Sequence, residues 1–209
     1  PMVTLAAAAA VPQNIRLITT VLLAPLRNTG IFAKEAATVD ALSCGRLTLG
    51  LGVGGRADDF WAAPASYSTR GKDFEIQLDA MTKVWSGKSL DTSEQIGPAP
   101  YRTNGPEIMI GGTHPRAVAR AVRWGSGYIA GPSSAAQVRE RFDVAKVAWD
   151  LEGREGRPYF VGLIYFALGP EVERGADFMR RYYSFNPTAV ESAVNGLRIT
   201  TQDLKDRLR

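Results

Sequence analysis

Hydrophobic and polar positions along this chain follow two alternating patterns, one typical of buried strands and the other of amphipathic helices. Residues 15–23 are largely β-branched or apolar, as expected for a strand covered on both faces of a parallel sheet. Over 29–42 the apolar residues recur at helical spacing, and Asn28 can cap this helix while Gly45 ends it. The chain therefore predicts a strand followed by a helix, and coiled coil is excluded.

The alternation continues to the end of the chain. Further strands are predicted at 46–53, 108–110, 128–130 and 159–168, and further helices at 2–10, 74–85, 115–124, 133–149 and after Thr200 or Thr201. Helix faces predicted to be buried are Ile31, Phe32, Ala36, Val39 and Leu42; Phe74, Leu78, Met81 and Trp85; and Val138, Phe142, Ala145 and Trp149. This order indicates an α/β fold with a parallel sheet, either a barrel or a doubly wound sheet.

Composition narrows the chemistry. With 209 residues, the chain is long enough for one domain over 1–209. Cys44 is the only cysteine and His114 the only histidine, so we expect no internal disulfide, no metal site and a reducing, cytoplasmic setting. The longest apolar runs, 1–12 and 159–168, are shorter than the roughly 20 residues of a membrane span. The net charge of +4 is scattered, and we expect neither membrane nor nucleic acid as a partner.

Two glycine-rich segments follow predicted strands. The first, 50–55, matches G-x-G-x-x-G, but Arg56 then leads into a proline-containing loop. No acid at a strand end follows about 20 residues later, as a dinucleotide site requires. Three interpretations stay open: a non-Rossmann cofactor loop, which we favour, a plain tight turn, and a Rossmann dinucleotide site.

The second segment, 111–115, joins a short strand to a helix that begins with proline. Gly111 and Gly112 would let a phosphate approach the backbone, and the free N–H groups of the helix start would hold it together with the Thr113 hydroxyl. The alternative is an ordinary turn with Thr113 as the helix cap. His114 lies where the helix dipole disfavours its cation, so we expect contact with a cofactor sooner than a role as base.

Two polar segments, 56–72 and 88–106, are predicted to be loops or insertions, and long loops of this kind often carry function. The sequence contains no G-x-S-x-G, G-x-x-x-x-G-K-[ST] or H-E-x-x-H motif, so hydrolase, kinase and metalloprotease functions have no support. Asp58 and Asp59 could form a metal or acid/base pair, and the cations Arg56, Arg70 and Lys72 could receive an anionic group. For both sets we favour a solvated surface.

Four ordered segments resemble the luciferase-like monooxygenase family, also called the bacterial-luciferase or flavin/F420-dependent oxidoreductase superfamily. They are IRLITTVLLAPLRN at 15–28, AKEAATVDALSCGRLTLGLGVG at 33–54, IMIGGTHP at 108–115 and WGSGYI at 124–129. The resemblance implies a TIM (β/α)8 barrel that binds FMN or coenzyme F420 at the carboxyl ends of its strands. It also implies a monooxygenase or a hydride-transfer enzyme acting on an organic small molecule. The Ala, Gly and Arg content slightly favours F420.

The resemblance also implies which residues contact the cofactor. Thr20 and Val21 match a pair that often forms a non-prolyl cis peptide against the flavin ring in this family. The other residues expected at the cofactor are Val53, Gly54 and Gly55 near the ring, and Gly111, Gly112, Thr113 and His114 at the phosphate.

Aligned with the family, the chain carries about strands three to seven of the barrel. The acid/base residues that the family places on the first two strands have no counterpart, so the catalytic residues stay unassigned. We expect either a piece of a longer protein or a barrel closed by a partner chain, with a homodimer as the expected assembly. Two other hypotheses are a non-catalytic remnant that binds a cofactor or a partner, and a nicotinamide enzyme of the Rossmann type.

Overall fold

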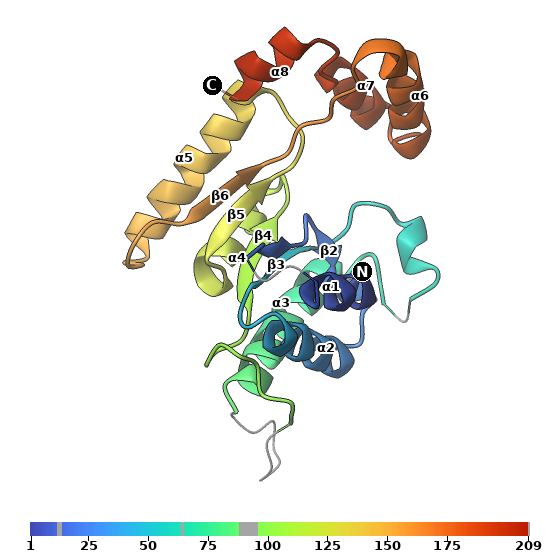
Figure 1. The fold of residues 1–209 in the computed structure, drawn as a ribbon. Coiled ribbons are helices and arrows are strands. Elements are labelled where there is room, and N and C mark those ends of the chain that lie inside the picture. Colours follow the sequence, from blue (N-terminus) through green and yellow to red (C-terminus); the bar gives the residue numbers. More distant parts are fainter. Residues whose placement is uncertain (12–13, 64, 88–95, 209) are drawn as a thin grey trace.

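One parallel sheet forms the centre of the molecule in this computed structural model, which describes residues 1–11, 14–63, 65–87 and 96–208. The strand order is β1-β3-β4-β5-β6, and β2 also pairs with β3 (Figure 1). The strands are β1 Leu17–Ile18, β2 Leu22–Leu23, β3 Leu47–Gly52, β4 Glu107–Gly111, β5 Gly127–Ala130 and β6 Tyr159–Gly162. The predicted α/β class is confirmed as a partial barrel.

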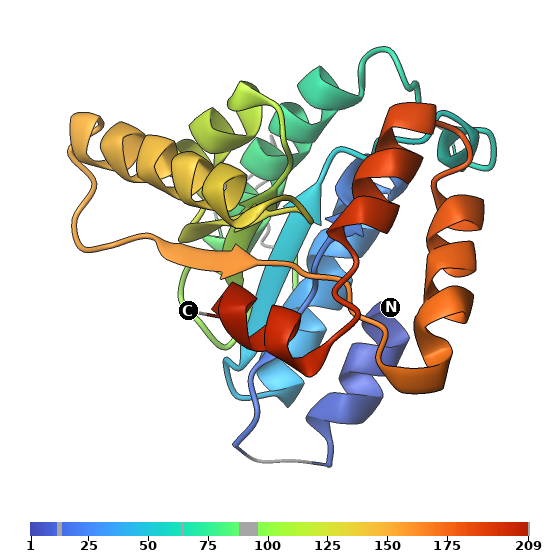
Figure 2. The ribbon, with the colours of Figure 1, turned by 90° about the horizontal axis from the view of Figure 1, so that it is seen from above.

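Helices α2 to α7 fall into two groups. Helices α2 to α5 alternate with the strands and pack beside the sheet, whereas α6 and α7 lie together beyond the carboxyl end of β6 (Figures 1 and 2). No helix of the described residues is long and apolar enough to cross a bilayer. The helices are α1 Met2–Ala9, α2 Thr29–Leu42, α3 Arg70–Trp85, α4 Pro115–Trp124, α5 Ala135–Leu151, α6 Val172–Tyr182, α7 Pro187–Gly196 and α8 Thr201–Leu208, with 3-10 turns η1 Ala24–Leu26, η2 Asp58–Phe60 and η3 Gly169–Glu171.

The strand predicted at 15–23 is interrupted. It forms two short pieces, β1 and β2, which pair with successive parts of β3, and the peptide bond between Thr20 and Val21 is cis. The Thr19 hydroxyl donates a 2.8 Å hydrogen bond to the Gly50 carbonyl beside this break. The prediction of one continuous strand is therefore wrong, while the predicted cis peptide is present.

The core lies between the sheet and helices α2 to α5. The predicted buried face of α3 is buried at all four positions, Phe74, Leu78, Met81 and Trp85. On α2 the prediction is partly wrong, because Ile31 and Leu42 are 61% and 57% exposed. The helix instead buries small residues, Ala33, Ala36 and Ala37, beside Phe32 and Val39, which permits close packing against α1 and α3.

Strand β6 is shorter and more exposed than the predicted strand at 159–168. It pairs only with β5 among the described residues, and its four residues are exposed or half-buried. After it the chain runs out to Phe166, which forms a single bridge with Arg198. An edge strand lacks the second neighbour that an all-apolar segment predicts.

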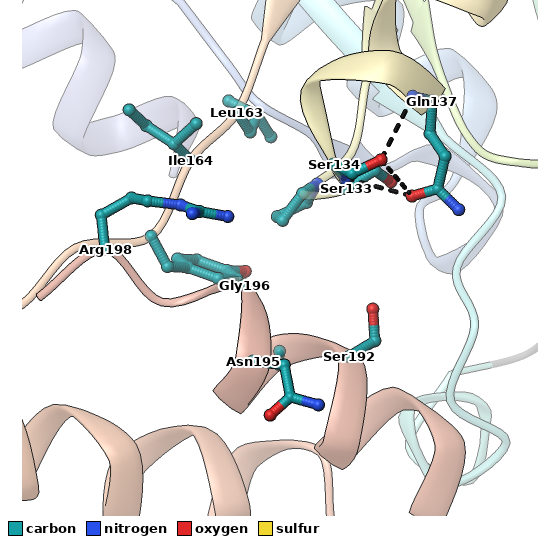
Figure 3. Close-up of a pocket in the computed structure, with 12 residues that line it drawn as sticks. Ser133, Ser134, Gln137, Leu163, Ile164, Ser192, Asn195, Gly196 and Arg198 are labelled. Carbon is teal, nitrogen blue, oxygen red and sulfur yellow. Dashed lines mark hydrogen bonds between the residues drawn. The ribbon is translucent and has the colours of Figure 1, made fainter. Parts of the chain in front are cut away.

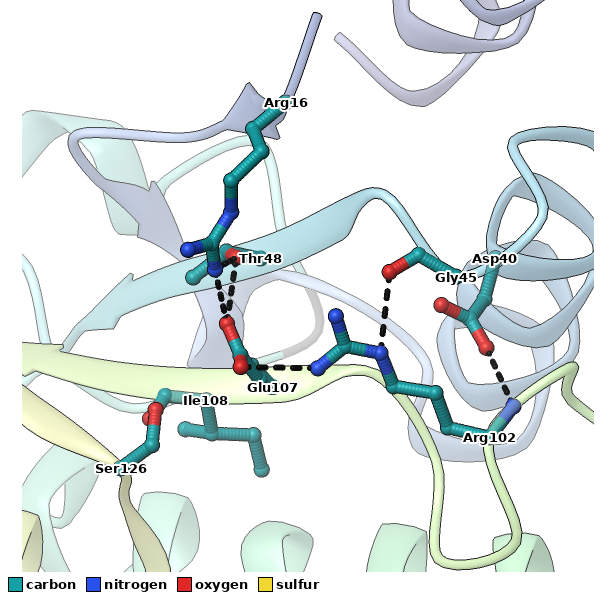
Figure 4. Close-up of polar contacts among 8 residues, drawn as sticks. All are labelled: Arg16, Asp40, Gly45, Thr48, Arg102, Glu107, Ile108 and Ser126. Carbon is teal, nitrogen blue, oxygen red and sulfur yellow. Dashed lines mark hydrogen bonds and ion pairs between the residues drawn. The ribbon is translucent and has the colours of Figure 1, made fainter. Parts of the chain in front are cut away.

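A polar cluster ties the amino ends of β1, β3 and β4 together (Figure 4). Glu107 accepts hydrogen bonds from Arg16, from the Thr48 hydroxyl at 2.9 Å and from Arg102 at 2.8 Å. Burial opposes ionisation of Glu107, but these hydrogen bonds and the two arginine charges outweigh it and hold the pKa of the carboxyl below its usual value. Nearby, burial raises the pKa of Asp40, which accepts a hydrogen bond from the Arg102 backbone.

Candidate functional site

The carboxyl ends of the strands meet at one edge of the sheet, where barrel enzymes place their sites. Val21 lies there against bare backbone from two neighbouring strands. A Cβ added to Gly52 would lie 2.9 Å from Cγ2 of Val21, and one added to Gly111 would lie 2.7 Å from its Cγ1. The structure therefore brings the cis peptide Thr20–Val21 together with the ends of β3 and β4, two of the places that the sequence predicted.

The turn between β4 and α4 has a fixed shape. Gly112 has a φ of +152°, which disfavours a side chain, and the Tyr128 hydroxyl donates a hydrogen bond to its carbonyl. Burial raises the pKa of that Tyr128 phenol. Among the described residues, the backbone N–H groups of Thr113 and His114 donate to no acceptor. Free N–H groups at a helix start are suited to hold an anion.

His114, and not Thr113, caps α4. Its Nδ1 accepts a 3.2 Å hydrogen bond from the Arg116 backbone N–H, and Pro115 occupies the first helical position. The alternative with Thr113 as the helix cap is therefore wrong, and the Thr113 residue is exposed. The Thr113 hydroxyl remains available beside the turn, whereas one nitrogen of His114 is engaged in holding the helix start.

The loop after β3 opens no helix at the glycines. Among the described residues between Gly55 and α3, which begins at Arg70, the short turn η2 is the one helical element. A Rossmann site needs a helix start directly after the glycine pattern, so that interpretation is wrong. The Arg70 guanidinium donates to the Gly54 carbonyl at 3.1 Å and lies over the Tyr67 ring. These two contacts connect Arg70 to both ends of the loop.

Arg56 joins this loop to the end of α6. Its Nε donates to Asp58 at 3.0 Å, its Nη1 donates to the Tyr182 carbonyl at 3.0 Å, and the guanidinium lies over the Phe185 ring. The Arg56 hydrogen bond holds the pKa of Asp58 below its usual value. Asp58 is therefore paired with a cation, and the described residues contain no group of acidic, histidine or cysteine side chains that could hold a metal ion.

Residues between β5 and α5 line a cavity that sequence reasoning missed (Figure 3). Ser134 caps α5 in a reciprocal capping box with Gln137, as the predicted helix start implied. Arg141, which lies further along α5, donates a 2.7 Å hydrogen bond to the Ser133 hydroxyl. No sequence pattern marked this cavity, because its lining comes from segments that are far apart along the chain.

Comparisons with known proteins agree with this architecture. An uncharacterized protein of Mycobacterium bovis is 28% identical over 188 residues, and the match covers 85% of this chain and 65% of that protein. The chain thus spans less than two thirds of the length of the curated relatives that it matches.

Two solved structures show the same fold. An F420-dependent secondary alcohol dehydrogenase in complex with an F420–acetone adduct is 13% identical with a TM-score of 0.74, covering 99% of this chain and 73% of that one. The oxygenating constituent of 3,6-diketocamphane monooxygenase from Pseudomonas putida, in complex with FMN, is 16% identical with a TM-score of 0.72, covering 94% and 63%. The family model for luciferase-like monooxygenase matches residues 1–207, and the chain belongs to this family.

Proposed function

We propose that the chain holds the phosphate and ring of a flavin-type cofactor, FMN or F420, in an oxidoreductase that acts on an organic small molecule. The observation that carries the proposal is the turn at the start of α4. There the free N–H groups of Thr113 and His114, a glycine whose φ disfavours a side chain, and the helix dipole favour a phosphate in the same place.

The ring would lie between this turn and the cis peptide. Val21 is half-buried and Thr20 exposed at the strand ends, and Gly54 and Gly55 present backbone without side chains. Such a surface lets a flat ring system approach the backbone closely. Val53, Gly54 and Gly55 are therefore proposed as contacts of the ring, beside Thr20 and Val21.

When bound, the cofactor would supply the redox chemistry, and the chain would supply orientation and a grip on the phosphate. Gly112 and Thr113 orient the phosphate, and His114 holds the helix start that faces it. His114 has no carboxylate hydrogen-bonded to it among the described residues, and we assign it no proton transfer. Two solved relatives of the fold contain FMN and F420 respectively, which supports either cofactor for this chain.

Introducing a negative charge into the turn tests this proposal. Gly112→Asp and Thr113→Glu are expected to weaken FMN or F420 binding, followed by cofactor fluorescence, at least ~100-fold, because a carboxylate would repel the phosphate at short range. Thr113 is exposed, so the second variant should fold even if the first does not. Gly30→Asp, in the first turn of α2, adds the same charge to a helix start away from the turn and should leave the affinity unchanged. Unchanged affinity in Thr113→Glu would contradict phosphate binding at residues 111–114, which we call the phosphate turn.

A further inference from the structure

The cavity beyond β5 has a volume of about 200 Å³. It lies at the carboxyl ends of β5 and β6, between the start of α5 and the end of α7 (Figure 3). A water molecule takes about 30 Å³ in the liquid, so this space admits a small polar group with a few waters. The cavity is one strand removed from the phosphate turn, which follows β4.

Arg198 is the positively charged residue that lines the cavity. Its backbone is fixed on both sides by a bridge, since its N–H donates to the Tyr165 carbonyl at 3.0 Å and its carbonyl accepts from Ala167 at 2.9 Å. The guanidinium points from this bridge toward Ser133 and Ser134 across the cavity (Figure 3). Its Nε is buried and has no hydrogen-bond partner among the described residues. Burying such a donor is costly unless a ligand or water accepts from it.

The other polar groups of the wall suit an anion. They come from the start of α5 and from α7, and no carboxylate lines the cavity among the described residues. Arg141 adds a second positive charge through its bond to the Ser133 hydroxyl. Asp203 lies near enough for Arg198 to help lower the pKa of its carboxyl, but the Thr200 hydroxyl is its main partner. The polar lining residues are Ser133, Ser134, Gln137, Ser192, Asn195 and Arg198.

Resting on the proposed function, we propose that this cavity binds an oxyanion of the organic substrate, a carboxylate, sulfonate or phosphate, with the Arg198 guanidinium as its main partner. The cofactor phosphate is assigned to the turn after β4, so an anionic group held after β5 is not that phosphate. The enzyme would then select substrates with a negative charge at one end. Guanidinium groups bind such planar or tetrahedral oxyanions through two parallel hydrogen bonds.

Site-resolved titration tests this assignment. Inorganic phosphate and acetate, as separate probes, would be added to the 15N-labelled chain while backbone amide signals are followed. Amides of Ser134, Asn195 and Gly196 report on the cavity, and those of Gly112 and Thr113 report on the phosphate turn. We expect saturable shifts at the cavity amides, and Arg198→Gln should weaken the affinity there about 10-fold, because a charge-assisted hydrogen bond is lost. Arg139→Gln, an exposed position on α5, is the matched control and should leave the curve unchanged.

The comparison of the two probes also shows whether the site prefers a tetrahedral or a planar oxyanion. Cavity amides that do not respond to either probe, or an unchanged curve in Arg198→Gln, would overturn the proposal. Loss of the response in the presence of saturating FMN or F420 would overturn it as well, since the cavity would then belong to the cofactor. Failure of both cofactors to bind would contradict the proposed function alone, because the phosphate and acetate curves are measured without them.

Discussion

Glu107 connects several segments at the amino end of the sheet through hydrogen bonds to its carboxylate. Its carboxylate accepts from Arg16, Thr48 and Arg102, which come from three separate segments, while its own backbone begins β4. The pKa of Glu107 lies below its usual value, so the ionised form is more stable in the folded than in the unfolded chain. No sequence pattern indicated this cluster, because Arg16 and Thr48 are far from Glu107 along the chain.

Replacing Glu107 tests the linkage between this carboxyl and stability. Glu107→Gln should lower the free energy of unfolding at pH 7 by about 1 to 3 kcal/mol, since it removes the negative charge that pairs with the Arg16 and Arg102 guanidinium groups. The difference between wild type and variant should be full above pH 4.5, the unfolded-state value, and should shrink as the pH falls through the lower folded-state pKa. Urea unfolding at a series of pH values measures it.

Asp177→Asn is the control for that series. Asp177 pairs with Arg180 on the surface of α6, where both side chains are at least half exposed. Its loss should change the free energy of unfolding by less than about 0.5 kcal/mol. A Glu107→Gln difference that stays constant or grows toward low pH would contradict the argument.

At the scale of elements, the helices were largely predictable and the irregular strands were not. Asn28 and Ser134 cap α2 and α5 as expected, because capping is a local effect of a few neighbouring residues. The break at Thr20–Val21 has no local apolar signal, and only the resemblance to a family indicated it. Helices α6 and α7 were not predicted, since the helix expected after the strand at 159–168 was the one that begins after Thr200 or Thr201, which the structure contains as α8.

The candidate site shows the same division. Its glycine turn after β4 could be found from sequence, because glycines between a strand and a proline-started helix are a local signature. The position of Arg198 in the cavity could not be predicted from sequence, since it depends on the bridge between Arg198 and Phe166. Long-range pairing of this kind leaves no periodicity in either segment.

Trp85 connects α3 to α2 and tests how that helix pair is held. Its side chain is 3% exposed, and Nε1 donates a 2.9 Å hydrogen bond to the Ala33 carbonyl. Trp85→Phe should lower the free energy of unfolding by about 2 kcal/mol, because a buried hydrogen bond is lost and a void is left. Trp61→Phe is the matched control, since Trp61 is 86% exposed. Equal stability of the two variants would argue against this packing.

Arg56 connects the loop after β3 to the end of α6. Arg56→Gln should speed hydrogen exchange in the loop and in the last turn of α6, since the bond to the Tyr182 carbonyl and the contact with Phe185 are lost. The global free energy of unfolding should change little, because the group is near the surface. Lys72→Gln, an exposed change near the start of α3, should leave exchange unaltered. Unaltered exchange in Arg56→Gln would show that the loop is held by other contacts.

At the scale of the whole molecule, the parallel sheet sets the position of every candidate residue. Parallel strands place all their carboxyl ends on one side, so the cis peptide, the glycine loop and the turn after β4 share one edge. The cavity with Arg198 lies on the same side, next along the order of strands. Cofactor and substrate would therefore meet at this edge of the partial barrel.

Binding of the cofactor by this chain is the central claim. The most direct measurement is a fluorescence titration of the purified chain with FMN, F420 and NADPH in parallel. We predict saturable one-to-one binding of FMN or F420, and none of NADPH, because no α-helix of the described residues starts directly after the glycines at 50–55 to hold a dinucleotide. Binding of NADPH alone, with no response to FMN or F420, would contradict the account.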